Sequence, residues 1–481
     1  MAQPNYQDYL TILPLITLIV WSCVLLLVDL FIPKKQKGWT AFLAAFGLVV
    51  TLGLTIGQIG QSNTGFSGMV LVDGFSTFAN VLLLTSGLFG IALAFGYTRR
   101  MGIERGEYYT LLIFSVSGMM LMAQAADLIV VFLALELLSI PLYVLAAFSR
   151  ANSQSQEAGV KYFLLGAFAT GFVVYGTALV FGATGTTSFS GIFFAVSNGA
   201  SILLLTIGAA LILVGFGFKV AAVPFHMWTP DVYEGAPTAV TAFMSSGAKI
   251  AGFAAMLRVF SSAFPALSAD ISDILWAFAA LTMVVGNLTA LSQTNIKRLL
   301  AYSSIAHAGY ILMAFVPYGN SEVSAVSIAA GLFYLVTYAL TNFGAWAVVI
   351  TLEKSEGKGL EINDYAGLAK KYPALAAAMT VFMLSFIGFP PTLGMVGKFY
   401  LFRAAVAGGY NGLAIIGVVT SLVSAYYYLR VVVTMYMREG DPTIEREPLL
   451  SITTAVTAIA TVVLSFVPQF LFLLSSTALV R

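Results

Sequence analysis

Residues 215–237 read GFGFKVAAVPFHMWTPDVYEGAP, an apolar run that contains Lys219 and is interrupted by three prolines. A second run over residues 385–402, SFIGFPPTLGMVGKFYLF, has two consecutive prolines followed by Lys398. Proline lacks a backbone donor and clashes with the preceding turn, so each run should form a broken helix. Broken helices persist in a membrane only when they are buried in protein or line a wet cavity. The two segments therefore predict a polytopic membrane protein with interrupted helices in its interior.

The composition of the whole chain agrees with a membrane protein. Of the 481 residues, 59% are hydrophobic and 9% are charged, against about 25% charged in soluble domains. Apolar stretches long enough to span a bilayer recur from end to end, which excludes a soluble globular enzyme. The single cysteine, Cys23, lies inside the first apolar run and is expected to be a small core residue. No disulfide framework or iron–sulfur ligand set is therefore predicted.

Apolar runs bounded by charged or turn residues predict an all-α protein with about fourteen transmembrane helices. They cover residues 9–32, 39–60, 75–97, 108–124, 126–148, 157–182, 199–233, 237–262, 273–292, 299–317, 325–352, 373–406, 411–437 and 450–475. The segment between the helices over 325–352 and 373–406 is predicted to be a solvated, charged connector.

The distribution of lysine and arginine gives an independent test of this helix count. Loops that follow odd-numbered helices hold fifteen of them: Lys34, Lys35, Lys37, Arg99, Arg100, Arg105, Arg150, Lys297, Arg298, Lys354, Lys358, Lys370, Lys371, Arg438 and Arg446. The opposite side, termini included, holds only Arg481. Positive loops stay in the cytoplasm, so both termini are predicted to lie outside.

The two broken helices occupy matching places in an internal repeat. Pro224 and Pro390 are 166 residues apart. Glu136 and His307, each two helices before its break, are 171 residues apart. The period is therefore five helices, and an odd number turns the second copy upside down. We predict a three-helix segment over 1–107, inverted repeats over 108–262 (helices 4–8) and 263–437 (helices 9–13), and a C-terminal helix over 438–481.

Charged side chains within the predicted helices are candidates for moving charge across the membrane. They are Glu136, Lys161, Lys219, Lys249 and Lys398. Each costs roughly 2.5–3.5 kcal/mol at a helix centre, and the five together cost about 12–17 kcal/mol. A chain that keeps such groups is expected to use them. Lys161 is nearer the end of its helix than the others, so it can alternatively extend to the interface.

The types of these residues favour proton transfer. A carboxylate such as Glu136 is neutral when isolated in lipid and ionised beside a lysine, so its charge can be switched. Buried lysines lose affinity for their proton and can carry it near neutral pH. His307 lies between Lys249 and Lys398 in chain order and is a natural intermediate. His226 lies at the first break. It either takes part in proton transfer or has a structural role, in which it holds the loop in place.

The remaining charged residues have simpler interpretations. Arg258, Arg403 and Arg430 lie near helix ends and are expected to anchor the chain at the lipid interface. Asp29 can pair with the basic residues 34–37 or with a neighbouring subunit. Two further acidic residues, Asp231 and Glu234, are expected to be loop or capping residues. The chain has no Walker loop, dinucleotide fingerprint or metal cluster, so an ion gradient or partner subunits must drive it.

Several segments resemble the antiporter-like membrane subunits of respiratory complex I. They are LELLSIPLYVLAAF (135–148), EAGVKYFLLGAF (157–168), KVAAVPFHMWTPDVYEGAPTAVTAFMSSGAKIAGF (219–253), IKRLLAYSSIAHAGYIL (296–312) and GFPPTLGMVGKFYLF (388–402). Within that family the chain most resembles the subunit N group, which includes mitochondrial subunit 2. The motifs cover the fifth to the twelfth helix, and the fourteen-helix layout extends the likeness to nearly the whole chain.

The resemblance implies a proton-translocating module of NADH:quinone oxidoreductase. By likeness, Glu136 and Lys219 form the glutamate–lysine pair of the first repeat. Lys249 matches the central lysine, and Lys398 the terminal lysine of the second half-channel. Protons would move along a hydrated axis, driven by quinone reduction elsewhere. FMN, iron–sulfur clusters and quinone are expected in partner subunits, and no cofactor is expected in this chain.

The resemblance also sets expectations for partners and for the alternatives. Neighbouring antiporter-like subunits, other membrane and peripheral subunits and lipids are the expected partners, with no nucleic acid. The three N-terminal helices, which mitochondrial versions lack, point to a bacterial plasma membrane. The alternative is a subunit of a multisubunit Na+/H+ antiporter, which shares the Glu136–Lys219 pair. A non-pumping bridging subunit and a redox subunit are further, weaker alternatives.

Overall fold

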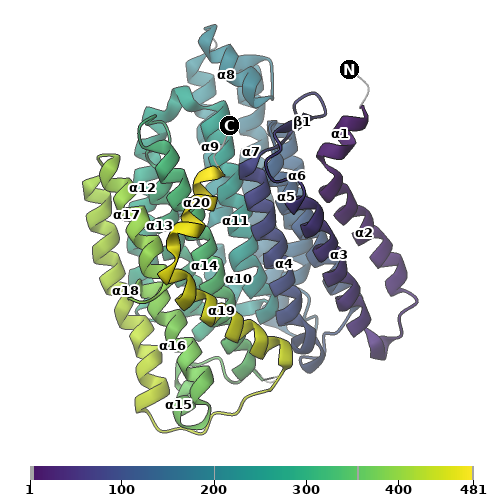
Figure 1. The fold of residues 1–481 in the computed structure, drawn as a ribbon, viewed down its shortest axis with the longest axis vertical. Helices are drawn as coiled ribbons and strands as arrows, with labels where there is room; N and C mark the ends of the chain where they lie inside the picture. The colour runs from purple at the N-terminus through teal and green to yellow at the C-terminus, as the bar shows by residue number, and fades with distance from the viewer. Residues whose placement is uncertain (1–4, 200, 355–356, 479–481) are drawn as a thin grey trace.

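The computed structural model describes residues 5–199, 201–354 and 357–478, and these form a bundle of helices. Most helices run along the long axis of the molecule in alternating directions (Figure 1). Ten helices among the described residues are long and apolar enough to cross a membrane. Mostly apolar sequence in lipid-length runs must satisfy its backbone polar groups internally, and helices do this.

The described residues contain twenty α-helices. In chain order, they are α1 (Tyr6–Thr11), α2 (Leu13–Asp29), α3 (Gly38–Ile56), α4 (Gly74–Arg100), α5 (Gly106–Gln124), α6 (Leu128–Ala146), α7 (Ser153–Thr184), α8 (Phe189–Ser197), α9 (Ile202–Val220), α10 (Trp228–Gly235), α11 (Thr238–Ala263), α12 (Ser268–Ala290), α13 (Ile296–Phe315), α14 (Ser324–Leu352), α15 (Leu368–Lys371), α16 (Pro373–Ile387), α17 (Leu393–Ala407), α18 (Asn411–Met437), α19 (Pro448–Phe466) and α20 (Pro468–Thr477). A two-stranded antiparallel hairpin, β1 (Asn63–Gly65) and β2 (Val70–Val72), joins α3 to α4.

All fourteen predicted ranges contain helix, so the predicted fold class is confirmed. Three short elements were not predicted: the hairpin, α8 and α15. The first and last predicted helices, 9–32 and 450–475, are wrong as single elements. The helix α1 ends at Thr11 before α2 begins at Leu13, and α19 ends at Phe466 before Pro468 starts α20. Arg481, part of the charge count, lies outside the described residues. The domain boundaries stay a prediction, although each falls within two residues of a helix end.

Both predicted breaks are present, and each follows a residue in the left-handed conformation. The helix α9 ends at Val220 and is followed by Ala221 (φ 62°), seven residues before α10 begins at Trp228. The helix α16 ends at Ile387 and is followed by Gly388 (φ 87°), and α17 begins at Leu393. A left-handed residue of this kind satisfies the last carbonyls of a helix and stops it. The prolines that follow then prevent the helix from resuming at once.

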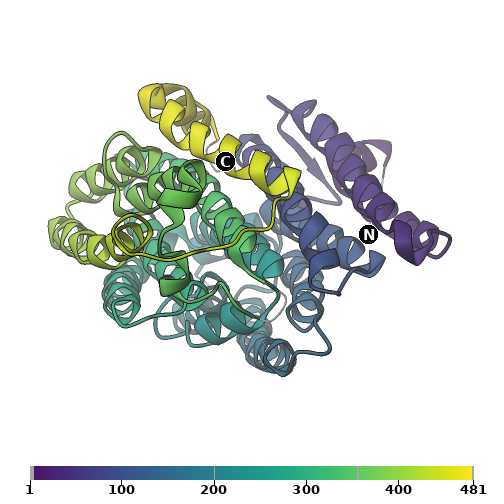
Figure 2. The same cartoon turned by 90° about the horizontal axis from the view of Figure 1, so that it is seen from below.

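The chain passes through the two breaks in opposite directions. The helix α9 starts near α8 at the upper end of the molecule, whereas α16 starts beside α15 at the lower end (Figure 1). Seen from below, α18 lies at one edge of the bundle and the α2–α3 pair near the other, with α19 and α20 along one side (Figure 2). The opposite directions are those that an inverted repeat requires.

Helix α11 is the most enclosed spanning helix of the described chain. Its membrane-spanning stretch is entirely buried, although it carries Lys249 and several hydroxyl side chains. Small residues allow this packing, since a Cβ on Gly252 would lie 3.3 Å from Cγ of Lys219 on α9. A polar face on a fully enclosed helix places its polar groups in the protein interior, away from lipid.

Three expectations for single residues are wrong. Cys23 is exposed on the outer face of α2 and is not a core residue. Arg258 is 1% exposed and donates to both carboxylate oxygens of Asp73, at 2.7 and 3.0 Å. Arg430 donates to the backbone carbonyls of Leu291 and Gln293, so it binds protein and not the interface. The position of each arginine along its helix does not indicate which neighbouring residues its side chain faces.

Candidate functional site

The Glu136 carboxylate and the Lys219 ammonium lie on facing helices of the first repeat but bind different partners. Thr170 on α7 donates to Glu136 at 2.9 Å. Lys219 is 3% exposed and donates to the Ser139 hydroxyl at 2.8 Å. Ser139 lies one turn from Glu136 on α6, so the two charged groups are neighbours without a direct ion pair. In the described residues, the two groups predicted to form a pair are therefore bound to separate partners, and their pairing stays a prediction.

The aromatic ring of Tyr162 covers the Lys219 ammonium. Its hydroxyl is 3.5 Å from Nζ, and Nζ is 5.7 Å from the ring centroid. Tyr162 in turn stacks on Trp228 of α10, with ring centroids 4.6 Å apart. A ring face stabilises a cation without neutralising it, which keeps the charge available.

Lys249 lies in the centre of α11 and bridges to the second repeat. Its side chain is 1% exposed, and Nζ donates to the Ser304 backbone carbonyl on α13 at 2.5 Å. The aliphatic part of Lys219 packs on Gly252, one helical turn along from Lys249. Among the described residues the Lys249 ammonium is thus held by a carbonyl dipole and has no carboxylate within ion-pair distance.

His307 continues the polar line on α13, one turn beyond Ser304. Its Nδ1 is 2.7 Å from the Tyr334 hydroxyl and its Nε2 is 3.1 Å from the Tyr428 hydroxyl. Tyr428 also contacts the Ser303 hydroxyl at 2.5 Å. Because both ring nitrogens face hydroxyl groups, His307 can accept a proton on one side and release one on the other.

Lys398 ends the line at the second break. Its Nζ donates to the Ile387 carbonyl at 2.9 Å and to the Ser421 hydroxyl at 2.6 Å. The ammonium also lies 4.5 Å from the ring centroid of Tyr310, three residues beyond His307 on α13. The structure therefore brings together the three buried lysines and His307 along a line that crosses both repeats.

Lys161 and His226 lie apart from this line. The Lys161 side chain is 40% exposed and pairs with Glu157 at 2.7 Å and with Asp231 at 2.8 Å. This favours its interpretation as an interfacial residue, and its part in proton transfer stays a prediction. His226 lies between α9 and α10, half-buried, and its Nδ1 has no hydrogen-bond partner among the described residues.

Asp231 and Glu234 are not simple loop or capping residues. Asp231 pairs with Lys161 on α7 and, at 3.0 Å, with Arg298 on α13. Glu234 pairs with the same arginine at 2.8 Å. The short helix α10 therefore links the two repeats through ion pairs at its exposed end. Sequence spacing alone does not reveal these partners, since they are distant along the chain.

The Asp231 carboxylate should stay ionised into the acid range. Burial raises its pKa, but Lys161 and Arg298 outweigh burial and hold the pKa below its ordinary value. The ion pairs therefore stabilise the fold above about pH 3.9, the unfolded value, and are lost only as pH falls through the lower folded value. Because these groups are about one-third exposed, the contribution is within about 1 kcal/mol.

We expect Asp231→Asn to lower the thermal midpoint of the detergent-solubilised protein slightly and equally at pH 7 and pH 5. The matched control is Asp441→Asn at the same end, whose pair with Lys371 is more exposed. A difference between wild type and Asp231→Asn that disappears between pH 7 and pH 5 would contradict the assignment.

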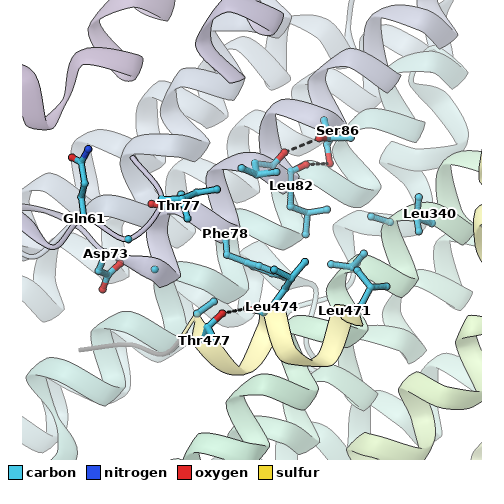
Figure 3. A pocket seen from close by; sticks show the side chains of 18 of the residues that line it. Gln61, Asp73, Thr77, Phe78, Leu82, Ser86, Leu340, Leu471, Leu474 and Thr477 are labelled. Atoms are coloured by element: carbon cyan, nitrogen blue, oxygen red, sulfur yellow. Dashed lines mark hydrogen bonds between the residues drawn. The ribbon is translucent and has the colours of Figure 1, made fainter. Parts of the chain in front are cut away.

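A separate cavity of about 540 Å³ lies between α4, α14 and α20. Phe78, Leu82, Leu340 and Leu474 are among its mostly apolar lining residues, and Asp73 lies at one end (Figure 3). The Ser86 hydroxyl is bonded to its own helix at the Leu82 carbonyl. None of the predicted proton-transfer residues lines this cavity, so we assign it no part in the polar line.

The structure adds residues that sequence reasoning missed. Ser139, Tyr162, Tyr334, Tyr428 and Ser421 supply the hydrogen-bond partners of the charged line. Uncharged hydroxyl residues are common in membrane helices, so their types gave no signal by themselves. Among the described residues no group of three or more His, Cys, Asp or Glu could hold a metal ion.

Comparison with known proteins identifies the family. Residues 125–424 match the family model described as NADH:quinone oxidoreductase/Mrp antiporter, TM. The chain is 51% identical over 432 residues to NADH-quinone oxidoreductase subunit N of Trichlorobacter lovleyi, covering 89% of this chain and 88% of that protein. It is 46% identical to the subunit N of Chloroflexus aggregans, over 98% and 97% of the two chains.

Solved structures agree with this assignment. A chain of respiratory complex I from Thermus thermophilus with bound aureothin matches with a TM-score of 0.83 and 36% identity, over 96% of this chain and 99% of that one. A chain of the Mrp complex from Dietzia has a TM-score of 0.86 over 98% and 97% of the two chains, but 20% identity, which shows a shared fold alone. The chain therefore belongs to the NADH:quinone oxidoreductase and Mrp antiporter transmembrane family, and within it to the subunit N group of NADH-quinone oxidoreductase.

Proposed function

We propose that this chain translocates protons across the membrane as an antiporter-like subunit of NADH:quinone oxidoreductase. The observation that carries the proposal is the line of buried cations that crosses both repeats. Lys219, Lys249 and Lys398 are each at most 3% exposed, and each ammonium is held by hydroxyl or carbonyl oxygens. Such groups are expensive in a membrane interior and are retained where protons or ions move.

The mechanism follows from the separated arrangement of Glu136 and Lys219. When the carboxylate approaches the ammonium, the pair favours the charged lysine. When they separate, as Ser139 and Thr170 hold them here, Lys219 more readily gives up its proton. The proton then passes to neutral Lys249, along α13 through His307, and on to Lys398, with water completing the path.

The energy comes from outside this chain. We propose that partner subunits hold FMN, iron–sulfur clusters and the quinone site, and that quinone reduction there drives the charge movement here. Neighbouring antiporter-like subunits would contact the exposed apolar faces. The protein would lie in a bacterial plasma membrane with both termini outside, since the positive loops lie at the opposite end.

Lys249→Ala tests the proposal. The variant removes the cationic side chain with which α11 reaches the second repeat, so NADH-driven proton pumping in inverted membrane vesicles should fall below half of the wild-type rate. Electron transfer from NADH to an artificial acceptor, which bypasses quinone, should not change. Lys370→Ala, an exposed lysine at the cytoplasmic end, is the matched control and should pump normally.

Wild-type pumping by the assembled Lys249→Ala complex would contradict the proposal. Sodium dependence of the pumped charge, or purification without NADH-oxidising partners, would instead favour an exchanger of the Mrp type.

A further inference from the structure

Glu353, expected in a solvated connector, is buried where α14 ends. Its side chain is 4% exposed, although Lys354 is half-buried and Gly357 and Lys358 are exposed. The Tyr97 hydroxyl donates to Oε1 at 3.4 Å, and Oε2 has no hydrogen-bond partner among the described residues. A buried carboxylate oxygen without a partner is rare in folded proteins and points to bound water or to a functional role.

The surroundings of Glu353 suit a group that binds and releases a proton. Burial raises the pKa of its carboxyl, and Lys297 offsets part of that rise. Lys297 is itself 3% exposed and donates to the Ala236 carbonyl at 2.7 Å. Thr238, the first residue of α11, lies on the same side and donates its backbone N–H to Tyr97. The carboxyl therefore faces two cations, Lys297 and the half-buried Arg100, and the hydroxyl groups of Tyr97 and Thr238.

A surface cavity at the cytoplasmic end adjoins the neighbours of Glu353. A polar surface cavity of about 340 Å³ is lined by Leu352 and Lys354, the residues on either side of it. Asn363 and Asp364 form another part of the wall. The carboxyl thus lies one residue from solvent, at the end that carries the positive loops.

From Glu353 a polar face leads inward to Lys249. On α11, Thr238, Thr241, Ser245 and Lys249 are spaced three or four residues apart and so share one face. On α14, Asn342 donates to Ser245 at 2.6 Å, eleven residues before Glu353. A row of hydroxyl groups on α11 therefore leads from the level of the buried carboxyl to the central lysine, and Asn342 of α14 faces it, although residues 343–350 of α14 are apolar apart from the indole N–H of Trp346.

Polar atoms without a partner are concentrated around this route. Among the described residues, six buried side-chain atoms near it make no hydrogen bond to protein: Glu353 Oε2, Tyr365 Oη, Thr238 Oγ1, Trp346 Nε1, Ser304 Oγ and Tyr338 Oη. Such atoms are usually completed by bound water. Four of them, on Glu353, Tyr365, Thr238 and Trp346, belong to the cytoplasmic side of the route, and the atoms of Ser304 and Tyr338 lie beside Lys249 and His307, so bound water along the route would satisfy them.

We propose that Glu353 takes up protons from the cytoplasm and delivers them to Lys249. The inference rests on the proposed function and assigns its intake group. A proton from cytoplasmic water binds the Glu353 carboxylate to give the neutral acid. The acid passes it through bound water and the Thr238 hydroxyl to the Lys249 amine, which becomes an ammonium, and the carboxylate is restored.

Glu353→Gln separates this role from a structural one. Glutamine has nearly the same shape and still accepts from Tyr97, so the end of α14 should stay in place. With the purified complex in liposomes, NADH-driven proton uptake should fall below half of the wild-type rate, while NADH oxidation by an artificial acceptor is unchanged. Glu439→Gln, an exposed glutamate at the same end, is the matched control and should pump normally.

Chemical rescue supplies a second measurement. In Glu353→Ala, added formate should restore proton uptake, because a small acid can replace the missing carboxyl, whereas a purely structural defect would not respond. If neither Glu353 variant assembles, Thr238→Val tests the inference in their place, because it removes only the adjacent hydroxyl group. Wild-type proton uptake by Thr238→Val would overturn the inference.

The outcomes distinguish this inference from the proposed function. Wild-type proton uptake by assembled Glu353→Gln overturns the intake role. If Lys249→Ala is defective at the same time, the pump proposal survives and only the intake group is wrong. If both variants pump normally, both proposals fail.

Discussion

Arg258→Ala should destabilise the protein by about 3–5 kcal/mol, because it leaves the Asp73 carboxylate charged, buried and unpaired. Both side chains of the pair are 1% exposed. Arg258 also donates to the Ala123 carbonyl and lies over the Phe75 ring, 4.8 Å from its centroid. The substitution therefore removes the contacts through which this arginine joins α11 to the start of α4.

The measurement is the thermal midpoint of the solubilised complex, together with the amount of this chain that stays in it. Arg403→Ala removes an exposed arginine and should leave both unchanged. The double variant Arg258→Met with Asp73→Asn removes both charges, so it should be more stable than Arg258→Ala alone. A midpoint for Arg258→Ala within error of wild type would show that the buried pair contributes nothing.

Gly394→Ala should displace the second broken helix. A Cβ on Gly394 would lie 1.8 Å from the backbone oxygen of Ser385, in the last turn of α16. Backbone cannot yield as a flexible side chain does, so α17 must move away from α16. Lys398 is one turn along α17 and donates to Ile387 on α16, so this bond should be broken. Overpacking of this kind costs about 1–3 kcal/mol.

We expect Gly394→Ala to pump at less than half of the wild-type rate and to lower the thermal midpoint. Gly412→Ala is the matched control, since a Cβ there has nothing within 4 Å. Normal pumping by Gly394→Ala, with Gly412→Ala also normal, would mean that the position of Lys398 relative to α16 does not matter.

The fold was largely predictable because lipid imposes simple requirements. A spanning helix needs a run of apolar residues of fixed length, and charged loops separate the runs, so helix positions follow from one-dimensional patterns. The breaks at 221–227 and 388–392 followed from proline chemistry in the same way. The hairpin and α8 were missed because they lie outside the spans, where the hydrophobic pattern is weak.

The site was only partly predictable. Lys219, Lys249 and Lys398 could be identified from the sequence because a charged residue in an apolar, membrane-spanning run seldom has a purely structural role. The same reasoning failed for Arg258 and Glu353, which lie near helix ends. Near a helix end a charged side chain can reach water at a small free-energy cost, so its presence is not informative. The sequence does not say whether such a side chain faces water or protein.

The sequence by itself determined that this is a membrane protein of about fourteen helices with two broken ones and charged residues in its interior. The length of an apolar run, the positions of prolines and the positions of lysines each affect structure locally. The linear sequence is therefore enough to predict the helices, their breaks and the charged positions. The tertiary structure alone decided which groups meet, such as Arg258 with Asp73 and Lys249 with Ser304. Those contacts join helices far apart in the chain, and their energies depend on distances and burial that exist only after packing.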